Sequence, residues 1–241
     1  MMRIISLLLQ ILLFNSMLFA EETEVIDYEI SYLGIPLLDM QLTWVEDDST
    51  VRVSYDNKTK PFINIIHPVH NIYRVQFMKP GFKPLNWAKT IREGNMHFRL
   101  SAYRSEDGSQ VSYSNDHTRE FPEGGFTVFS ATHYLASSAN DASFFPASLK
   151  VFIDGEVWEA RATRYDYRNP HPDHYVRGDE VLIQADLHYL SGSSLLEEND
   201  ILTSHIAREG TQFFLWVSKH GVFTKAQFDK FPRAVVLKMK K

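Results

Sequence analysis

The sequence contains no cysteine among its 241 residues. Disulfide bonds therefore cannot stabilise the fold, and thiolate catalysis and cysteine-ligated metal sites are excluded. The sequence signatures of several enzyme classes are missing too: no Gly-x-Ser-x-Gly elbow, His-Glu-x-x-His motif, P-loop or dinucleotide-binding glycine motif occurs. Basic residues are not in excess, since 30 acidic residues stand against 25 basic ones. This charge balance gives no support to nucleic-acid binding.

One long hydrophobic run is present, and it lies at the N-terminus. Arg3 precedes the apolar stretch Ile4–Leu13, and Ala20 precedes the acidic pair Glu21-Glu22. An early cation, a short apolar stretch and a small residue before a polar shift are the three regions of a secretory signal peptide. The run is shorter than the roughly 20 apolar residues that span a membrane. We therefore predict a signal peptide over residues 1–20, with an uncleaved anchor as the alternative.

The chain that follows this segment is acidic and uniform in composition. Without Arg3 it carries 24 basic and 30 acidic residues, a net charge of −6 that favours solubility. About 220 residues can bury a core without cross-links. No repeat, low-complexity linker or composition break divides the chain, so we predict one domain over residues 21–241 rather than two small ones.

Apolar and polar residues alternate through most of this domain. In Ile26–Tyr32 and Val181–Tyr189 every second residue is apolar, the pattern of a strand with one buried face. Asp107-Gly108 and Asp154-Gly155 separate such segments and predict hairpins, because Asp-Gly tolerates the positive φ angles of a tight turn. About a dozen strands in hairpin order predict a mainly β protein. Its core would be a single large antiparallel, strongly curved sheet, or an open or closed β-barrel.

Two segments depart from this alternation. Phe126, Phe129 and His133 recur at helical spacing, so Phe126–Ser138 is predicted to form one short helix. Ser191–Asn199 is small and polar and is predicted to be a loop, although Leu195-Leu196 could begin a helical turn.

Several segments together resemble the DUF3108 family, a group of bacterial exported proteins of unknown function. The resemblance covers most of the mature chain and is carried by five loose motifs: Tyr28-Glu-Ile-Ser-Tyr-Leu-Gly34-Ile-Pro-Leu, Ile65-Ile-His-Pro-Val-His-Asn-Ile-Tyr-Arg74, Gly81-Phe-Lys-Pro84-Leu, Phe126-Thr-Val-Phe-Ser-Ala-Thr-His-Tyr-Leu135 and Phe213-Phe-Leu-Trp216-Val-Ser-Lys. The resemblance implies a β domain in a Gram-negative periplasm. It implies no reaction, because the family has none established.

Two short motifs bring histidines close together in the sequence. They are His67-Pro-Val-His70 and His171-Pro-Asp173-His174. Imidazole nitrogens bind zinc or copper, and Asp173 could complete a mixed site. A strand, however, places residues three apart on opposite faces, and proline breaks the helix that would align them. We therefore favour turn residues over a metal site.

The remaining polar candidates are also interpreted as loop or turn residues rather than as catalytic groups. Gly192-Ser193-Ser194 lacks the strand-to-helix turn of a serine nucleophile, and Asp47-Asp48 and Glu197-Glu198 resemble solvated turns. No residue is assigned as catalytic, cofactor-binding or metal-ligating, and no cofactor is expected.

Aromatic residues make up 13% of the chain, and all four tryptophans fall in predicted strands: Trp44, Trp87, Trp158 and Trp216. Aromatic side chains in such positions usually form a β-sheet core. A curved sheet can also hold an acyl chain, a glycan or a peptide on its concave face.

From these features we predict a non-enzymatic periplasmic binding or assembly factor. Its partner would be an apolar, lipid or glycan ligand or an envelope protein. A hydrolase acting on envelope glycan, lipid or peptide is the alternative, and converging titratable groups in one cleft would favour it. A structural role in an outer-membrane complex would instead require an exposed apolar patch or an unpaired edge strand.

Overall fold

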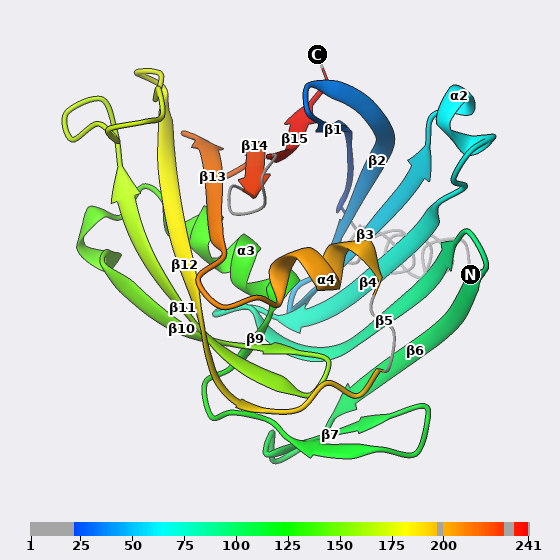
Figure 1. Ribbon diagram of the computed structural model, residues 1–241. Coiled ribbons are helices and arrows are strands. Elements are labelled where there is room, and N and C mark those ends of the chain that lie inside the picture. Colours follow the sequence, from blue (N-terminus) through cyan, green and yellow to red (C-terminus); the bar gives the residue numbers. More distant parts are fainter. Residues whose placement is uncertain (1–21, 197–199, 229–233, 241) are drawn as a thin grey trace, which may run out of the picture.

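The computed structural model describes residues 22–196, 200–228 and 234–240, so the predicted signal peptide lies outside the described residues. Fifteen strands form one large sheet (Figure 1). The strands are β1 (Glu22–Tyr32), β2 (Ile35–Glu46), β3 (Thr50–Thr59), β4 (His70–Met78), β5 (Lys83–Glu93), β6 (Met96–Arg104), β7 (Gln110–Tyr113), β8 (Thr118–Glu120), β9 (Phe126–Thr127), β10 (Ala147–Ile153), β11 (Glu156–Tyr165), β12 (Glu180–Gly192), β13 (Gln212–Ser218), β14 (Phe223–Phe228) and β15 (Val235–Met239).

With the exception of β8 and β9, strands that follow one another in the chain are neighbours in the sheet. The order is β8-β7-β6-β5-β4-β3-β2-β1-β15-β14-β13-β12-β11-β10-β9. Strand β15 pairs with both β1 and β14, and so joins an N-terminal half of the sheet to a C-terminal half. Strands β8 and β9 are the two edges, and the sheet does not close. The prediction of a large antiparallel sheet is confirmed, in its open form, with one parallel pair between β9 and β10.

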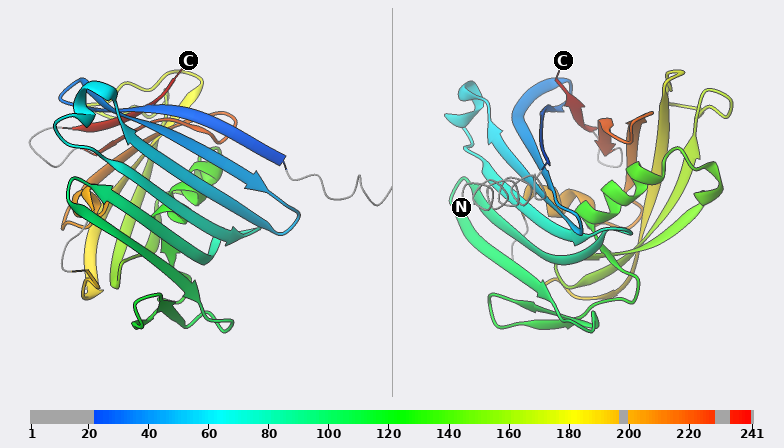
Figure 2. Two further views of the ribbon diagram at one scale, coloured as in Figure 1. Left: turned by 90° about the vertical axis from the view of Figure 1, so that its right-hand side faces the viewer. Right: turned by 180° about the vertical axis from the view of Figure 1, so that it is seen from behind.

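The sheet is strongly curved, so that one of its two faces is concave (Figure 2). Helix α3 (Val128–Ser138) lies within this concavity and was predicted over Phe126–Ser138. It begins two residues later because Phe126 and Thr127 form β9. Thr127 then caps the helix in a reciprocal pair with Ser130, which satisfies backbone N–H groups of the first turn.

Two further α-helices and one short 3-10 helix (Ala142–Phe144) occur in the described part of the chain, and the sequence pattern did not predict them. Helix α2 (Pro61–Asn64) connects β3 to β4, and helix α4 (Ile201–Ile206) connects β12 to β13. Asp200 caps α4 by accepting a hydrogen bond from the backbone N–H of Thr203. No helix among the described residues is long and apolar enough to cross a lipid bilayer.

The predicted hairpin at Asp154-Gly155 is present between β10 and β11. Both residues have positive φ angles, 46° and 100°, as a tight two-residue turn requires. The turn at Asp107-Gly108 is longer, because β6 ends at Arg104 and β7 begins at Gln110.

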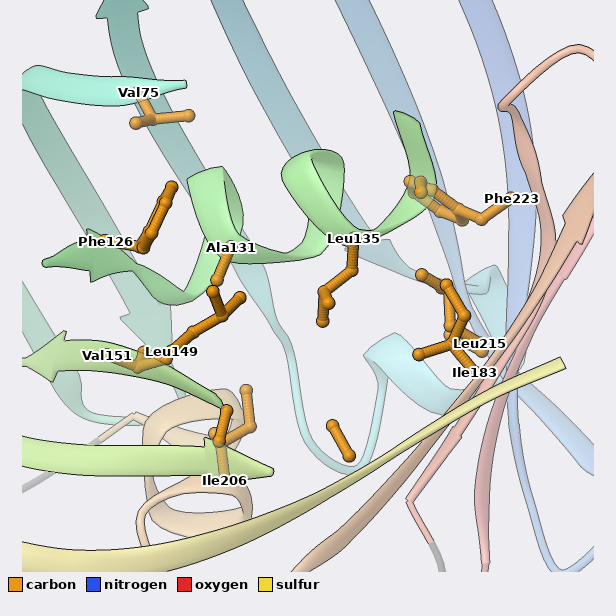
Figure 3. Packing of buried hydrophobic residues seen from close by; sticks show 14 of the residues in the cluster. Val75, Phe126, Ala131, Leu135, Leu149, Val151, Ile183, Ile206, Leu215 and Phe223 are labelled. Carbon is orange, nitrogen blue, oxygen red and sulfur yellow. The ribbon is translucent and has the colours of Figure 1, made fainter. Parts of the chain in front are cut away.

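The main hydrophobic core lies on the concave side of the sheet. Ala131 and Leu135 of α3 point into the same interior as Leu149 and Val151 of β10 and Leu215 of β13 (Figure 3). A smaller cluster lies on the outer face of β12 and β13, around Leu182, Phe214 and Trp216. Strand alternation therefore supplies two buried faces at this part of the sheet.

Candidate binding cavity

A cavity of about 480 Å³ lies between α3, α4 and the concave face of the sheet. Strands β1–β5 and β10–β15 contribute to its wall, so both halves of the sheet are needed to form it. Its lining is hydrophobic apart from four described residues: Asn57, Asn71, Glu93 and Thr132. The volume lies within the roughly 300–1,000 Å³ of typical small-molecule sites.

Small inward-facing residues on the C-terminal half of the sheet leave room for this cavity. Ala160, Ala185 and Ala226 line it from β11, β12 and β14, and each is nearly fully buried. Because an alanine side chain ends at Cβ, these positions do not reach across to α3. Leucine or phenylalanine at the same positions would occupy the space.

The cavity is closed at one end and reaches the surface at the other. Leu135, Leu215 and Phe223, next to α3, are at most 4% exposed. Ile201, at the start of α4, is 44% exposed, and Tyr32 at the end of β1 is half-buried. The exposed end therefore lies where β1 ends and α4 begins, and α3 closes the other end.

His133 belongs to the closed end, behind the cavity. Its Nε2 lies 2.6 Å from the hydroxyl oxygen of Tyr55, and its ring packs 4.9 Å from the ring of Trp44. Burial lowers the pKa of His133 to about 3, so the imidazole is neutral at pH 7. The residue packs as an uncharged aromatic group and offers no cation to the cavity.

A network of buried charges attaches α4 to the sheet beside the cavity. The ammonium group of Lys89 on β5 donates hydrogen bonds to Asp154 in the β10–β11 turn and to Asp200, the latter at 2.9 Å. Asp200 also accepts from the hydroxyl of Tyr73 at 2.8 Å. Burial disfavours the charge on Lys89, but the two carboxylates outweigh it and raise the pKa of Lys89. The network thus links β4, β5, the β10–β11 turn and α4.

Glu93 carries a second connection between β5 and α4. Its carboxylate accepts from the backbone N–H of Ile201, at 3.1 and 3.2 Å, and from the side-chain amide of Asn71. Burial raises the pKa of Glu93, although these hydrogen bonds oppose the rise. In contrast to Asp154 and Asp200, Glu93 lines the cavity.

His70, His171 and His174 face outward from the sheet. His67 instead lies in the loop before β4, close to Glu93, and Val69 of the same motif lines the cavity. His70 is close to Asp56, with 3.1 Å between the ring nitrogen and the carboxylate. His171 contacts Gln184 at 3.1 Å, and the His174 ring packs 4.2 Å from Phe214. Among the described residues no group of three or more His, Cys, Asp or Glu side chains is placed to hold a metal ion.

The other sequence candidates occupy turns. Asp47 accepts backbone hydrogen bonds from Ser49 and Thr50, which lower its pKa to about 2, and Asp48 is exposed. Ser194 bonds within its own loop, to the backbone of Leu196. Glu197-Glu198 lies outside the described residues.

The tryptophans pack against other side chains and do not line the cavity. Trp44 contacts Phe77 and His133, while Trp87 contacts Phe121 and Phe152. Trp158 lies against Tyr189. The fourth, Trp216, is buried on the outer face. The interpretation of these residues as packing groups is therefore confirmed, and the aromatic lining of the cavity comes from phenylalanine and tyrosine.

Sequence reasoning missed the polar residues of the cavity, although the pattern contained a signal. Asn57, Asn71 and Glu93 occupy the inward-facing positions of otherwise alternating strands, in phase with Tyr55, Tyr73 and Ile91. A polar residue at a strand position where its alternating neighbours are apolar faces the interior, and it needs hydrogen-bonding partners there. The pattern could thus have identified them as buried polar groups, but not the helix they contact.

Comparison with known proteins supports the fold and goes no further. No family model matches the sequence, and no curated protein matches it. A crystal structure of a beta-barrel-like protein of the domain of unknown function DUF1849, from Brucella abortus, is similar in fold, with a TM-score of 0.51 at 9% identity. The similarity covers 92% of this chain and 96% of that chain. The resemblance to DUF3108 proteins and the export of the chain stay predictions.

Proposed function

We propose that this protein is an exported, non-enzymatic binding protein of the cell envelope that holds one apolar molecule in the cavity. The observation that carries the proposal is the cavity itself: hydrophobic side chains from ten strands and two helices surround about 480 Å³. A hydrocarbon chain inside would contact hydrophobic groups on all sides, whereas water would find few hydrogen-bonding partners. Export rests on the N-terminal sequence pattern, and a periplasmic location on the resemblance to DUF3108 proteins.

The proposal is tested by asking what the protein carries when purified from its own envelope. Native mass spectrometry of the full-length product should show added mass that organic extraction removes. Repeated recovery of the bare polypeptide mass, together with failure of hydrophobic probes to bind, would contradict the proposal.

A cavity-filling variant provides the specific test. Ala185→Phe places a ring in the cavity and should abolish the added mass and the binding of a hydrophobic fluorescent probe. Ala88→Phe is the matched control: Ala88 lies out of phase with the inward-facing Lys89, and its cross-strand neighbours are Arg74 and Ser101. Thermal unfolding of both variants separates loss of binding from loss of folding. Equal binding by Ala185→Phe and the natural protein would locate the ligand elsewhere.

A hydrolase remains the second candidate because Glu93, a carboxylate with a raised pKa, borders the cavity. Lys89 and Tyr73 both donate to Asp200 at the start of α4, so these three groups are committed to the fold. Acid–base hydrolysis commonly uses two groups on the reacting bond, and Glu93 is the one acidic residue among the described lining. Turnover of an ester, glycoside or peptide that Glu93→Gln abolishes would establish the hydrolase instead.

A further inference from the structure

The exposed end of the cavity differs chemically from its closed end. The closed end, around Leu135, Leu215 and Phe223, presents hydrocarbon and aromatic carbon. Toward α4, the wall contains Asn57, Asn71 and Glu93. This division matches a molecule with an apolar tail and a polar head. The tail would lie against α3 and the head beside α4.

The hydrogen-bonding capacity left over at the polar end consists mainly of acceptors. Asn57 is 8% exposed, its amide nitrogen donates to the backbone oxygen of Asn71 at 3.4 Å, and no described residue donates to its Oδ1. Asn71 is fully engaged, because its amide nitrogen donates to Glu93 and its Oδ1 accepts from the backbone of Arg92. Glu93 accepts from two donors, the amide of Asn71 and the backbone N–H of Ile201, which its two oxygens share, whereas a carboxylate can accept about four hydrogen bonds.

The fixed charge near this end is negative, since the carboxylates of Glu93, Asp154 and Asp200 outnumber the ammonium of Lys89. Asp154 and Asp200 pair with Lys89, whereas Glu93 lies near the imidazole of His67, which stands in the exposed loop before β4. The three protons of that ammonium are directed at Asp154, Asp200 and Thr203, so Lys89 has none left for a ligand.

Lys60, which precedes α2, is also occupied, by carboxylates that do not line the cavity. Lys60 pairs with Glu29 at 2.8 Å and with Asp39 at 3.3 Å. A carboxylate or phosphate head group at the polar end would therefore meet like charges and unused acceptors, with no lysine available to pair with it.

We infer that the cavity takes a single-chain amphiphile whose head is uncharged or cationic and donates hydrogen bonds, with Asn57 and Glu93 as the selecting residues. A hydroxyl head fits, since it can donate to Asn57 or Glu93 and accept from the amide of Asn57. An ammonium head fits because it adds attraction to the carboxylates. Fatty-acid anions of the same chain length are disfavoured. This inference rests on the proposed apolar-ligand binding and specifies its head group.

The test compares three compounds with one chain: 1-dodecanol, dodecylamine and dodecanoate, each below its micellar concentration at neutral pH. Displacement of N-phenyl-1-naphthylamine, an uncharged hydrophobic probe, from the full-length protein measures the affinity of each. We expect dodecanol and dodecylamine to bind about tenfold or more tightly than dodecanoate, the magnitude of one hydrogen bond to a charged group.

Two variants connect this selectivity to named side chains. Glu93→Gln keeps the shape and an acceptor for Ile201, and should bring the affinity of dodecanoate to within a few-fold of that of dodecanol. Asn57→Leu should weaken dodecanol more than dodecylamine, since only the alcohol uses both the donor and the acceptor of the amide. Glu159→Gln is the control, because it removes the same charge from a side chain that bonds to Ser148 and Arg161 outside the cavity.

The possible outcomes distinguish apolar-ligand binding from selection of the head group. If none of the three compounds displaces the probe, the proposed function fails and the inference fails with it. If all three bind equally, or dodecanoate binds most tightly, apolar-ligand binding stands and the head-group inference is overturned. An unchanged selectivity in Glu93→Gln would likewise overturn the assignment to Glu93.

Discussion

At the scale of single residues, His133 shows how burial decides the chemistry of a side chain. It stands on α3 among the rings of Trp44, Tyr55, Phe77 and Phe223. The sequence placed it in helical phase with Phe126 and Phe129, but did not identify the rings that surround it. In the folded protein its pKa falls from 6.5 to about 3, because the surrounding rings cannot solvate an imidazolium.

This shift predicts that the protein loses stability as the pH falls from about 6.5 toward 3. The folded pKa is below the unfolded pKa, so only the unfolded chain gains a proton in this window and the folded state is disfavoured. At pH 5 the loss from His133 amounts to about 2 kcal/mol. Urea unfolding at pH 7.5 and pH 5 measures it.

A variant assigns this loss to His133. In His133→Gln the difference in unfolding free energy between the two pH values should shrink by about 2 kcal/mol. In His117→Gln, which changes an exposed histidine, it should stay as in the natural protein. The same pH dependence in all three proteins would contradict the assignment.

At the scale of elements, α4 has only six residues and depends on its contacts with the sheet. A helix this short is not stable alone, since nucleation costs more than so few hydrogen bonds return. Glu93 and Asp200 bind its first backbone N–H groups, and Lys89 binds Asp200. Its position beside the cavity is therefore set by β5.

We expect Lys89→Met to destabilise the protein by about 3–5 kcal/mol, because it leaves the carboxylates of Asp154 and Asp200 buried without their cation. Lys58→Met is the matched control, since Lys58 pairs with Asp56 at the surface and should cost at most about 1 kcal/mol. Chemical denaturation of both variants provides the comparison. A cost for Lys89→Met no greater than that of the control would show that the buried network does not hold α4.

At the scale of the whole molecule, β15 is the strand that turns two half-sheets into one. Its residues pair with β1 through Val235–Met239 and with β14 through Val235–Lys238. Val235 and Leu237 also line the cavity. The last strand of the chain thus completes both the sheet and the wall of the proposed binding site.

Ending the chain after Phe228 removes β15 and should expose the edges of β1 and β14, which are long enough to pair with other chains. We expect the shortened protein to elute as higher-order species in size-exclusion chromatography and to lose probe binding. A synthetic peptide of residues 234–240 should restore part of the monomer. Deletion of Lys241 alone, which leaves β15 intact, is the control. A monomeric shortened protein that still binds the probe would refute this role of β15.

The strands themselves could be predicted because alternation is a local property. Residues two apart lie on one face of a strand, so the hydrophobic phase of Val181–Tyr189 specifies both the strand and its buried side. The β10–β11 hairpin could be predicted for the same reason, because its signal is contained in two adjacent residues, Asp154-Gly155, which adopt the required backbone angles.

The cavity and its polar wall, in contrast, were decided by tertiary structure. Tyr73 and Asp200 are separated by 127 positions, and Lys89 and Asp200 by 111. The alternation in β5 indicates that Lys89 and Glu93 face inward, but no local pattern indicates which distant segment these side chains contact. The sequence alone therefore determined a β protein and the buried side of its strands. Whether the sheet closes, where α4 rests and that a cavity remains depended on contacts between distant segments, which exist only once the sheet has curled.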